Sequence, residues 1–298
     1  MKRHAYCIIA HNDAYCLEKL ISLIDDERND IILIFDKKSD LSNSFLPQTR
    51  FSRILRPQSS QLIDIQWGGV SLMKAEMLAM SIAVEAGKYD YIHLISGVDL
   101  PLKSQDYIHN FFYRLKPGTN CMSFINEEYK LDAFNANCRY YHLFTNYARC
   151  KNIFVRKFCS LMRKSFIRLQ QGFGYERNWS GWTFGKGTNW VSITYDFANY
   201  LVKNKETIIK RFRGVHCSDE IWKHTMLLSS SYKDTVANFE GLSNCVRRID
   251  WNRGNPYTWR LEDYDELAEC NELFARKFNS CQDTSLINKI YDYVKQQS

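Results

Sequence analysis

The chain has 298 residues, of which 45% are hydrophobic and 24% are charged. A chain of this length and composition can bury a substantial core, which excludes an intrinsically disordered protein. The formal net charge of +7 points to an anionic partner, such as a phosphorylated small molecule, an anionic membrane surface or nucleic acid, and charge alone does not choose among these.

The first four residues lead directly into a predicted strand at residues 5–10, which is too short for the apolar region of a secretion signal. No stretch approaches the roughly 20 apolar residues that a membrane-spanning helix requires. We therefore expect a cytoplasmic protein, in which the ten cysteines are reduced thiols. No two cysteines are separated by two residues, so a structural zinc site is not expected.

Residues 4–103 alternate between apolar runs, typical of buried strands, and amphipathic stretches, typical of helices. The predicted strands are 6–10, 31–35, a short one within 50–55, and 91–95. The predicted helices are a first one that carries Leu17, Leu20, Ile21 and Ile24, and a second one at 72–86 that Gly87 closes. This order predicts an α/β fold with a mostly parallel central sheet that helices cover on both faces.

After residue 103 the predicted elements are shorter and less regular. Helices are expected at 104–115, 195–203, 206–213, 219–228, 261–269 and 284–294, and short strands at 121–125, 190–193 and 244–251. Asp263 and Asp265 stand at an apparent helix start, where capping explains them better than metal binding does. No internal repeat or low-complexity linker occurs, so we expect a single domain over residues 1–298.

Residues 133–175 contain no Asp or Glu but eight Lys and Arg residues. Within them Phe154, Phe158, Leu161 and Met162 recur at helical spacing, which predicts a basic amphipathic helix over residues 153–170. The basic side chains that fall largely on another face are Arg156, Lys157, Arg163 and Lys164. This face is suited to an anionic lipid surface, although a simple solvated face explains the charges equally well.

Two carboxylates follow predicted strands directly. The strand at 91–95 ends abruptly at a Ser-Gly pair, and Asp99 follows just past its carboxyl end. Pro101 prevents both a continuing central strand and an immediate helix. Asp36 follows a strand in the same way. Because ligands of open α/β sheets bind outside the carboxyl ends of the strands, both carboxylates are candidates for a ligand site.

The short signatures of nucleotide and hydrolase sites are absent from the sequence. There is no GxGxxG after a predicted strand, no GxxxxGK[ST] and no GxSxG. The residues that could carry chemistry are instead spread along the chain: Asp36, Asp99, Glu220, Arg247, Arg248, Arg276 and Lys277. Singly they point to no reaction, and only their arrangement along the chain is informative.

Six short segments occur in a definite order along nearly the whole chain. They are residues 35–39 (FDKKS), 94–102 (LISGVDLPL), 187–190 (GTNW), 218–220 (SDE), 249–251 (IDW) and 273–278 (LFARKF). Together they resemble the core-2/I-branching β-1,6-N-acetylglucosaminyltransferases, the family that also holds the peptide xylosyltransferases. The stem, membrane anchor and paired cysteines of animal relatives are missing, so the chain resembles a compact, bacterial-type cytosolic member.

The resemblance implies an inverting glycosyltransferase of the GT-A fold that binds a UDP-sugar without a metal ion or other cofactor. UDP-GlcNAc is the implied donor, and the implied acceptor group is a hydroxyl, the 6-OH, of a glycan. Residues 1–125 would then form the nucleotide-binding half, and residues 126–298 the acceptor and catalytic half. Residues 126–142 do not match closely enough for acceptor contacts to be carried over.

By the same likeness, Glu220 is the general base that removes the proton from the acceptor hydroxyl. Lys277 matches the family's phosphate-binding lysine, and an arginine on the preceding strand matches its partner. Arg247 shares the strand parity of Ile249 and is preferred, whereas a shift of register would exchange it with Arg248. The simpler explanation of these residues is that each cation is a solvated surface charge and that Glu220 only stabilises the start of its helix.

The remaining candidates concern the nucleotide and the acceptor. Asp36 resembles the residue that reads the uracil edge, and Trp67 falls where the family has an aromatic residue before its second large helix. Asp99 belongs to the donor site, where it either contacts the nucleotide or orders the turn. Trp182, in a loop at 178–188 that is rich in Trp and Gly, is a candidate for stacking on an acceptor sugar.

Three functions fit these observations. The first is an N-acetylglucosaminyltransferase that builds a bacterial surface polysaccharide on a lipid-linked acceptor, at the inner face of the cytoplasmic membrane. The second keeps the fold but transfers xylose or another sugar from its UDP-sugar. The third is a non-catalytic glycan- or nucleic-acid-binding protein, although no nucleic-acid recognition motif occurs and we expect no nucleic-acid partner.

Overall fold

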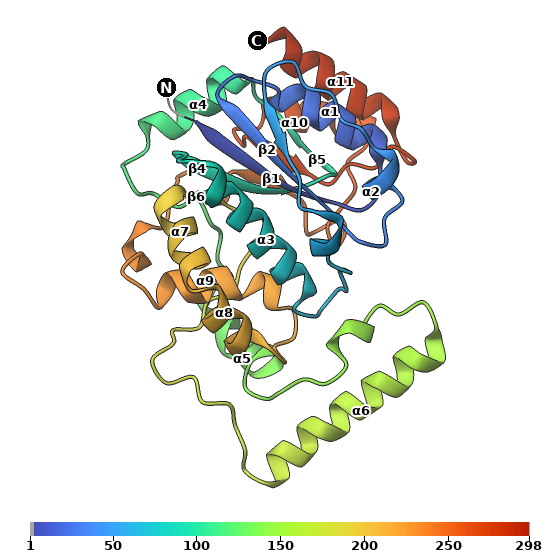
Figure 1. The fold of residues 1–298 in the computed structure, drawn as a ribbon, viewed down its shortest axis with the longest axis vertical. Helices are drawn as coiled ribbons and strands as arrows, with labels where there is room; N and C mark the ends of the chain where they lie inside the picture. Colours follow the sequence, from blue (N-terminus) through green and yellow to red (C-terminus); the bar gives the residue numbers. More distant parts are fainter. Residues whose placement is uncertain (1–2, 298) are drawn as a thin grey trace.

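The computed structural model describes residues 3–297, and its central element is a five-stranded sheet (Figure 1). Residues 1, 2 and 298, at the ends of the expected single domain, lie outside the described residues. The strands are β1 (His4–Ala10), β2 (Asn29–Phe35), β3 (Arg53–Leu55), β4 (Tyr91–Ser96) and β6 (Ser192–Thr194). They lie in the order β3-β2-β1-β4-β6, with β6 antiparallel to β4 and the other pairs parallel. The predicted α/β class with a mostly parallel central sheet is therefore confirmed.

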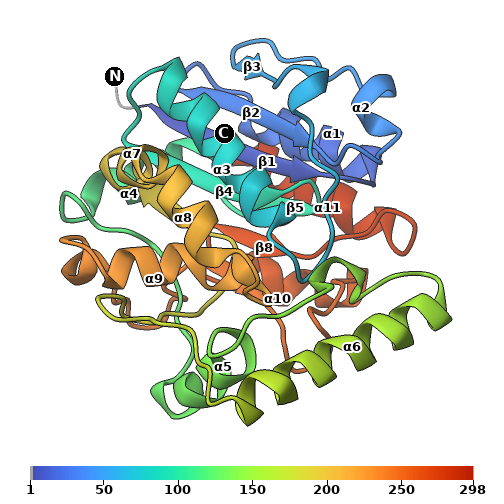
Figure 2. The same cartoon turned by 60° about the horizontal axis from the view of Figure 1, so that its bottom comes forward.

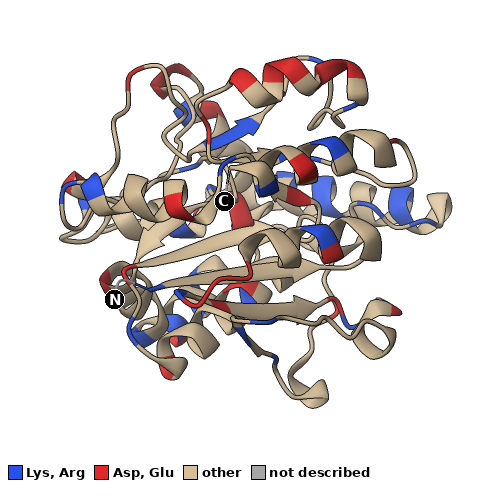
Figure 3. Cartoon of the chain, turned by 90° about the horizontal axis from the view of Figure 1, so that it is seen from above, with Lys and Arg blue, Asp and Glu red and all other residues tan. Residues whose placement is uncertain are grey.

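Helices cover both faces of this sheet (Figures 1 and 2). The helices are α1 (Ala14–Ile24), α2 (Leu41–Ser44), α3 (Ser71–Ala86), α4 (Gln105–Arg114), α5 (Lys130–Asn137), α6 (Ile153–Gly172), α7 (Tyr195–Lys203), α8 (Lys205–Phe212), α9 (Trp222–Leu228), α10 (Tyr264–Glu269) and α11 (Thr284–Gln296). Along β1, Tyr6 and Ile8 enter a core shared with α1, α4, α10 and α11, whereas Cys7 and Ile9 enter a core shared with α3, α7, α8 and α9. Charged residues lie mainly in the helices and loops around the sheet (Figure 3).

A second, three-stranded sheet joins distant parts of the chain beside the end of β4. Strand β5 (Asp99–Pro101) pairs antiparallel with β8 (Phe274–Arg276), which pairs parallel with β7 (Arg247–Ile249). The register sets Asp99 opposite Arg276. Candidate residues that are far apart in the sequence therefore meet where the parallel strands of the central sheet end.

Several predicted elements are shorter or interrupted. The helix predicted over 219–228 divides into a 3-10 turn, η4 (Ser218–Glu220), and α9. The interruption falls at Ile221, whose φ of −118° departs from the helical value. The strand predicted over 121–125 forms isolated bridges instead of a ladder, because its residues pair with different segments of the chain.

Helix α6 agrees with the predicted basic amphipathic helix and extends it to Gly172. It lies at the margin of the molecule, joined to the body by long connecting segments (Figures 1 and 2). Within this helix only Cys159 and Gln170 are buried, so α6 contributes little to either core. Neither α6 nor any other helix within residues 3–297 is long and apolar enough to cross a membrane.

Candidate active site

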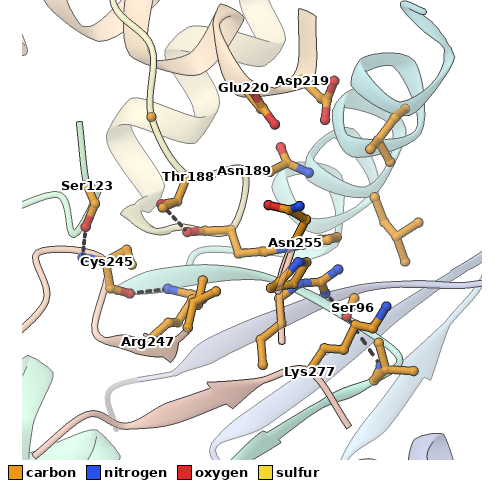
Figure 4. Close-up of a pocket in the computed structure, with 18 of the residues that line it drawn as sticks. Ser96, Ser123, Thr188, Asn189, Asp219, Glu220, Cys245, Arg247, Asn255 and Lys277 are labelled. Carbon is orange, nitrogen blue, oxygen red and sulfur yellow. Dashed lines mark hydrogen bonds between the residues drawn. The ribbon is translucent and has the colours of Figure 1, made fainter. Parts of the chain in front are cut away.

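A cavity of about 1050 Å³ opens at the carboxyl ends of β1, β2 and β4. Ala10, Asp36 and Ser96 line it from these strand ends. The opposite wall comes from residues 186–190 and from η4, whereas Lys277 lies on the side of Ser96 (Figure 4). This is the crevice in which open α/β sheets bind their ligands.

Glu220 ends η4 and directs its carboxylate into the cavity (Figure 4). Its backbone is fixed there, because Gly187 N donates to the Glu220 carbonyl oxygen at 2.9 Å. The side chain remains 36% exposed, and its one ion-pair partner among residues 3–297 is Lys186, whose Nζ lies 3.2 Å from Oε2. A fixed backbone and an accessible carboxylate are what a general base for an incoming hydroxyl requires.

Asp219 lies beside Glu220 and also lines the cavity. Burial, followed by the nearby carboxylates of Glu76 and Glu220, raises the pKa of Asp219 to about 7. Near neutral pH a large share of this carboxyl group is therefore protonated and can donate a hydrogen bond. The sequence did not single out Asp219, because an acid in the first turn of a helix is sufficiently explained by the helix dipole.

Six Lys and Arg residues line the same cavity, and three of them, Arg149, Arg276 and Lys277, lie near one another. Burial, together with the positive charges of Arg276 and Arg149, lowers the pKa of Lys277. Arg276 pairs with a carboxylate, whereas neither Arg149 nor Lys277 has one within 4.0 Å among the described residues. An excess of positive charge in a partly buried cavity is suited to a multiply charged anion.

Asp99 holds Arg276 in place and does not itself line the cavity. The Asp99 carboxylate accepts hydrogen bonds from Ser96 N at 2.9 Å and from Ser96 Oγ at 2.6 Å. Arg276 Nη1 donates to Asp99 Oδ1 at 2.9 Å, and the Arg276 guanidinium lies 4.7 Å from the ring centroid of Trp190. Of the two roles expected for Asp99, its burial supports the ordering role and not contact with the nucleotide.

The family comparison agrees with the resemblance drawn from the six sequence segments. The model of the Core-2/I-branching enzyme family matches residues 4–269, which is most of the chain. The chain belongs to the Core-2/I-branching enzyme family. It is therefore a glycosyltransferase, which takes a nucleotide-sugar donor and a glycan acceptor.

A comparison with curated protein sequences finds no match. Among solved structures, the crystal structure of mouse xyloside xylosyltransferase 1 in its apo form is similar to the chain, with a TM-score of 0.40 and 9% sequence identity. The likeness covers 95% of this chain and 99% of the mouse chain.

The two arginines predicted to bind the diphosphate of the branching-enzyme donor are both engaged elsewhere. Arg247 is buried, and its guanidinium donates to the Ser192 hydroxyl and to three backbone carbonyl oxygens, those of Leu94, Val191 and Cys245. Arg248 donates to Glu266 Oε1 at 2.6 Å on a partly exposed surface. Both residues contribute to the cavity wall, but the cations that lie beside Lys277 are Arg149 and Arg276.

Asp36 and Trp67, the residues expected to contact the nucleoside of the branching-enzyme donor, both line the cavity. Asp36 Oδ1 accepts from the backbone N–H groups of Lys38 at 3.1 Å and Ile65 at 3.2 Å, which fixes the carboxylate orientation. Trp67 is exposed, and the Arg149 guanidinium lies 3.9 Å from the centroid of its ring. This stacking holds Arg149 at the cavity. Nucleoside binding by Asp36 and Trp67 fits these positions and stays a prediction.

Trp182, the candidate for the acceptor sugar of the branching enzyme, is not among the residues that line the cavity. Its partly buried ring packs against Phe212, with 6.4 Å between ring centroids, and Arg211 lies 4.8 Å from its centroid. Trp190 lines the cavity instead. The composition of a loop does not tell which tryptophan packs on a neighbouring helix and which reaches a ligand, so the acceptor role of Trp182 loses its support.

A buried ion pair lies behind the cavity of the branching enzyme and was not anticipated from the sequence. Lys223 Nζ donates to Glu76 Oε2 at 2.6 Å, to Asn189 Oδ1 at 2.7 Å and to the Asp219 carbonyl oxygen at 2.9 Å. The side chains of Glu76 and Lys223 are fully buried. Lys223 therefore holds the side chain of Asn189, a residue that lines the cavity (Figure 4).

Within residues 3–297, no group of three or more His, Cys, Asp or Glu side chains is arranged to hold a metal ion. Metal-independent action of the branching enzyme stays a prediction, which chelation experiments can test.

Proposed function

We propose that this branching-family enzyme transfers GlcNAc from UDP-GlcNAc to a hydroxyl, the 6-OH, of a glycan acceptor, with inversion and without a metal ion. The observation that supports the proposal is that one cavity holds an accessible carboxylate, Glu220, and the cations Arg149, Arg276 and Lys277. A transfer of this kind requires both groups: the carboxylate takes a proton from the acceptor, and the cations stabilise the negative charge of the departing UDP.

In the proposed reaction, the acceptor oxygen attacks the anomeric carbon on the face opposite the diphosphate. A bond from this oxygen to the anomeric carbon forms while the bond to the diphosphate oxygen breaks, and UDP leaves with the electron pair. Glu220 accepts the proton of the acceptor hydroxyl. Arg276 and Lys277 contact the diphosphate, and Asp99 acts through Arg276 as a positioning residue. Fixed cations in a partly buried site supply the charge stabilisation that a divalent metal ion supplies in other transferases.

We further propose that the acceptor is lipid-linked and that the enzyme contributes to a bacterial surface polysaccharide at the cytoplasmic face of the membrane. The net charge of +7 supports an anionic partner of this kind. A second support is the position of Arg149, which lines the cavity and lies only a few residues before the basic helix α6. Cytoplasmic location and peripheral membrane contact are parts of the proposal.

The donor and the metal requirement are tested by measuring UDP-GlcNAc binding calorimetrically with and without EDTA. We expect the same affinity in both conditions, and binding that EDTA abolishes would overturn the metal-free mechanism. Slow release of UDP from a panel of UDP-sugars then tests the sugar. Faster release from UDP-xylose than from UDP-GlcNAc would assign a xylosyltransferase instead.

The catalytic assignment is tested with Glu220→Gln, which keeps the shape of the side chain but cannot accept the proton. We expect kcat to fall by about 10²–10⁴-fold while UDP-GlcNAc affinity stays nearly unchanged. Glu206→Gln is the matched control, because Glu206 lies exposed on α8 and is not among the residues that line the cavity. Transfer that survives Glu220→Gln intact would remove Glu220 from the reaction. Wild-type chain that binds a glycan but transfers no sugar would instead favour a non-catalytic glycan-binding protein.

A further inference from the structure

Helix α6 presents a stripe of large apolar side chains to solvent. Phe154 is 80% exposed, Phe158 60%, Leu161 61% and Leu169 55%. At the 3.6 residues per turn of an α-helix, these four positions fall within about 80° of arc on one side of α6. Met162 extends the same stripe and is also exposed. Most amphipathic helices of globular proteins turn such a face toward the core, but α6 turns it away.

The opposite side of α6 holds the helix to the body through a polar contact. Gln170, one of the two buried residues of α6, donates from Nε2 to the Tyr141 carbonyl oxygen and accepts from Tyr141 N, both at 2.9 Å. Cys159, the other buried residue, lies on the same side. The orientation of α6 is therefore fixed by its buried side, which leaves the apolar stripe exposed.

Basic side chains border the apolar stripe. Lys157, Lys164 and Arg168 fall within about 40° of one another along one flank of the stripe. All three are exposed, and none has a carboxylate within 4.0 Å in the described part of the chain. The whole segment 133–175 carries no Asp or Glu that could compensate them. An apolar face with a cationic border is the arrangement of helices that lie in the interface of anionic membranes.

We propose that α6 docks on an anionic lipid bilayer, with Phe154, Phe158 and Leu161 entering the acyl region and the flanking lysines and arginine contacting lipid headgroups. A second copy of this chain is a poorer occupant, because two such helices would bring their cationic flanks together without acids to pair them. The phosphates of a nucleic acid would pair with the basic side chains but would leave the apolar stripe exposed to water. A bilayer of anionic lipid satisfies both features at once.

This docking rests on the proposed function in one respect, because it assigns the surface for the membrane contact proposed there. It does not depend on the transfer reaction, since neither the donor nor Glu220 takes part. It does have a consequence for the cavity. Residue Arg149 lines the cavity and stacks on Trp67, and α6 begins at Ile153. A bilayer under α6 is therefore close along the chain to a residue of the cavity wall, an arrangement suited to an acceptor that is itself held in the membrane.

Sedimentation with vesicles tests the proposal on the full chain, using phosphatidylglycerol mixed with phosphatidylcholine and, in parallel, phosphatidylcholine alone. We expect the wild-type chain to bind the anionic vesicles and to bind the neutral ones at least about tenfold more weakly. The variant F154S/F158S/L161S, and separately K157E/K164E/R168E, should each lose about tenfold or more in partitioning to anionic vesicles.

Two matched controls separate α6 from general surface effects. K203E/K205E/K210E changes the net charge by the same amount on exposed positions of α7 and α8, and L46S/F51S removes exposed apolar side chains elsewhere. Both should keep most of the wild-type binding, and circular dichroism with UDP-GlcNAc binding checks that every variant is folded.

Three results would each overturn the proposal. The wild-type chain does not bind anionic vesicles, the folded α6 variants bind them as well as wild type does, or the control variants lose as much binding as the α6 variants. A wild-type dimer that becomes monomeric in F154S/F158S/L161S without any vesicle binding would assign the stripe to a second copy and overturn it as well. Vesicle binding without any transferase activity would support docking while the proposed reaction failed, so the two failures are distinguishable.

Discussion

Replacement of Lys223 by Met is the sharpest test of how the active site is supported. The Lys223 ammonium group is fully buried and donates to Glu76, Asn189 and the Asp219 backbone at 2.6–2.9 Å. Methionine preserves the length of the side chain and removes the charge. The Glu76 carboxylate then stays buried with Trp222 Nε1, at 2.7 Å, as its remaining donor among the hydrogen bonds described.

The magnitude follows from leaving one buried charge without its partner, which costs about 3–5 kcal/mol. With an unfolding entropy of about 2.1 cal/mol/K per residue, 298 residues give about 0.6 kcal/mol/K. The expected loss in Tm is therefore about 5–8 °C. Glu76→Gln combined with Lys223→Met should recover at least half of this loss, because the neutral amide needs no counter-charge while it can still accept from Trp222.

The loss should also depend on pH. Burial raises the pKa of Glu76, and the charge of Lys223 opposes that rise. Without Lys223 the folded-state pKa rises further above its unfolded value, so the folded state binds a proton that the unfolded state has released, and stability falls as pH increases above about 4.5. Differential scanning calorimetry at pH 5 and pH 8 should therefore give a larger Tm deficit for Lys223→Met at pH 8.

A Tm within about 2 °C of wild type for Lys223→Met, or a double variant as unstable as the single one, would refute the reasoning. The first result would mean that the pocket around Glu76 relaxes or admits water. The second would mean that the loss arises from packing and not from the unpaired carboxylate.

Two further predictions concern residues of the cavity wall. Asp219 has a pKa raised from 3.8 to about 7, so the folded state keeps a proton that the unfolded state releases. The stability of the wild-type protein should therefore fall between about pH 4 and pH 7 relative to that of Asp219→Asn. A Tm difference between the two proteins that is constant from pH 4 to pH 8 would contradict this. Arg247→Met should destabilise the fold by about 3–5 kcal/mol, because buried carbonyl oxygens lose their hydrogen-bond donor. Arg248→Met should cost about 1 kcal/mol or less, because the ion pair of Arg248 with Glu266 is partly exposed. Equal Tm losses in thermal melts would show that Arg247 does not have this structural role.

The sequence was sufficient for the central sheet and for the position of the ligand crevice. Long apolar runs can be buried on both faces only in a sheet that helices cover, so β1, β2 and β4 were recognisable without any tertiary information. The same runs end at polar residues, which located Asp36 and the segment around Asp99. Glu220 was found through its segment SDE, and the cavity contains it.

The choice among the arginines could not be made from the sequence. Strand parity tells which side of a strand a residue faces, but β7 has only three residues, and parity does not tell what lies on that side. For Arg247 the neighbours are carbonyl oxygens of β4 and of the segment before β6, so its charge is used inside the fold. Arg276 became a cavity residue because the pairing of β5 with β8 sets Asp99 opposite it.

Amphipathic periodicity and basic composition, which are local properties, predicted a helix over residues 153–170 with one apolar side, and the structure extends it to Gly172. Which side faces solvent depends on the residues that the rest of the chain places against the helix. Here the backbone of Tyr141 forms hydrogen bonds with Gln170, whereas Phe154 and Phe158 stay exposed. The sequence by itself thus determined the sheet, its crevice and the amphipathic helix, because these follow from local patterns. Only the tertiary structure decided the use of each charge and the exposure of the apolar stripe, because both depend on partners that are distant in the sequence.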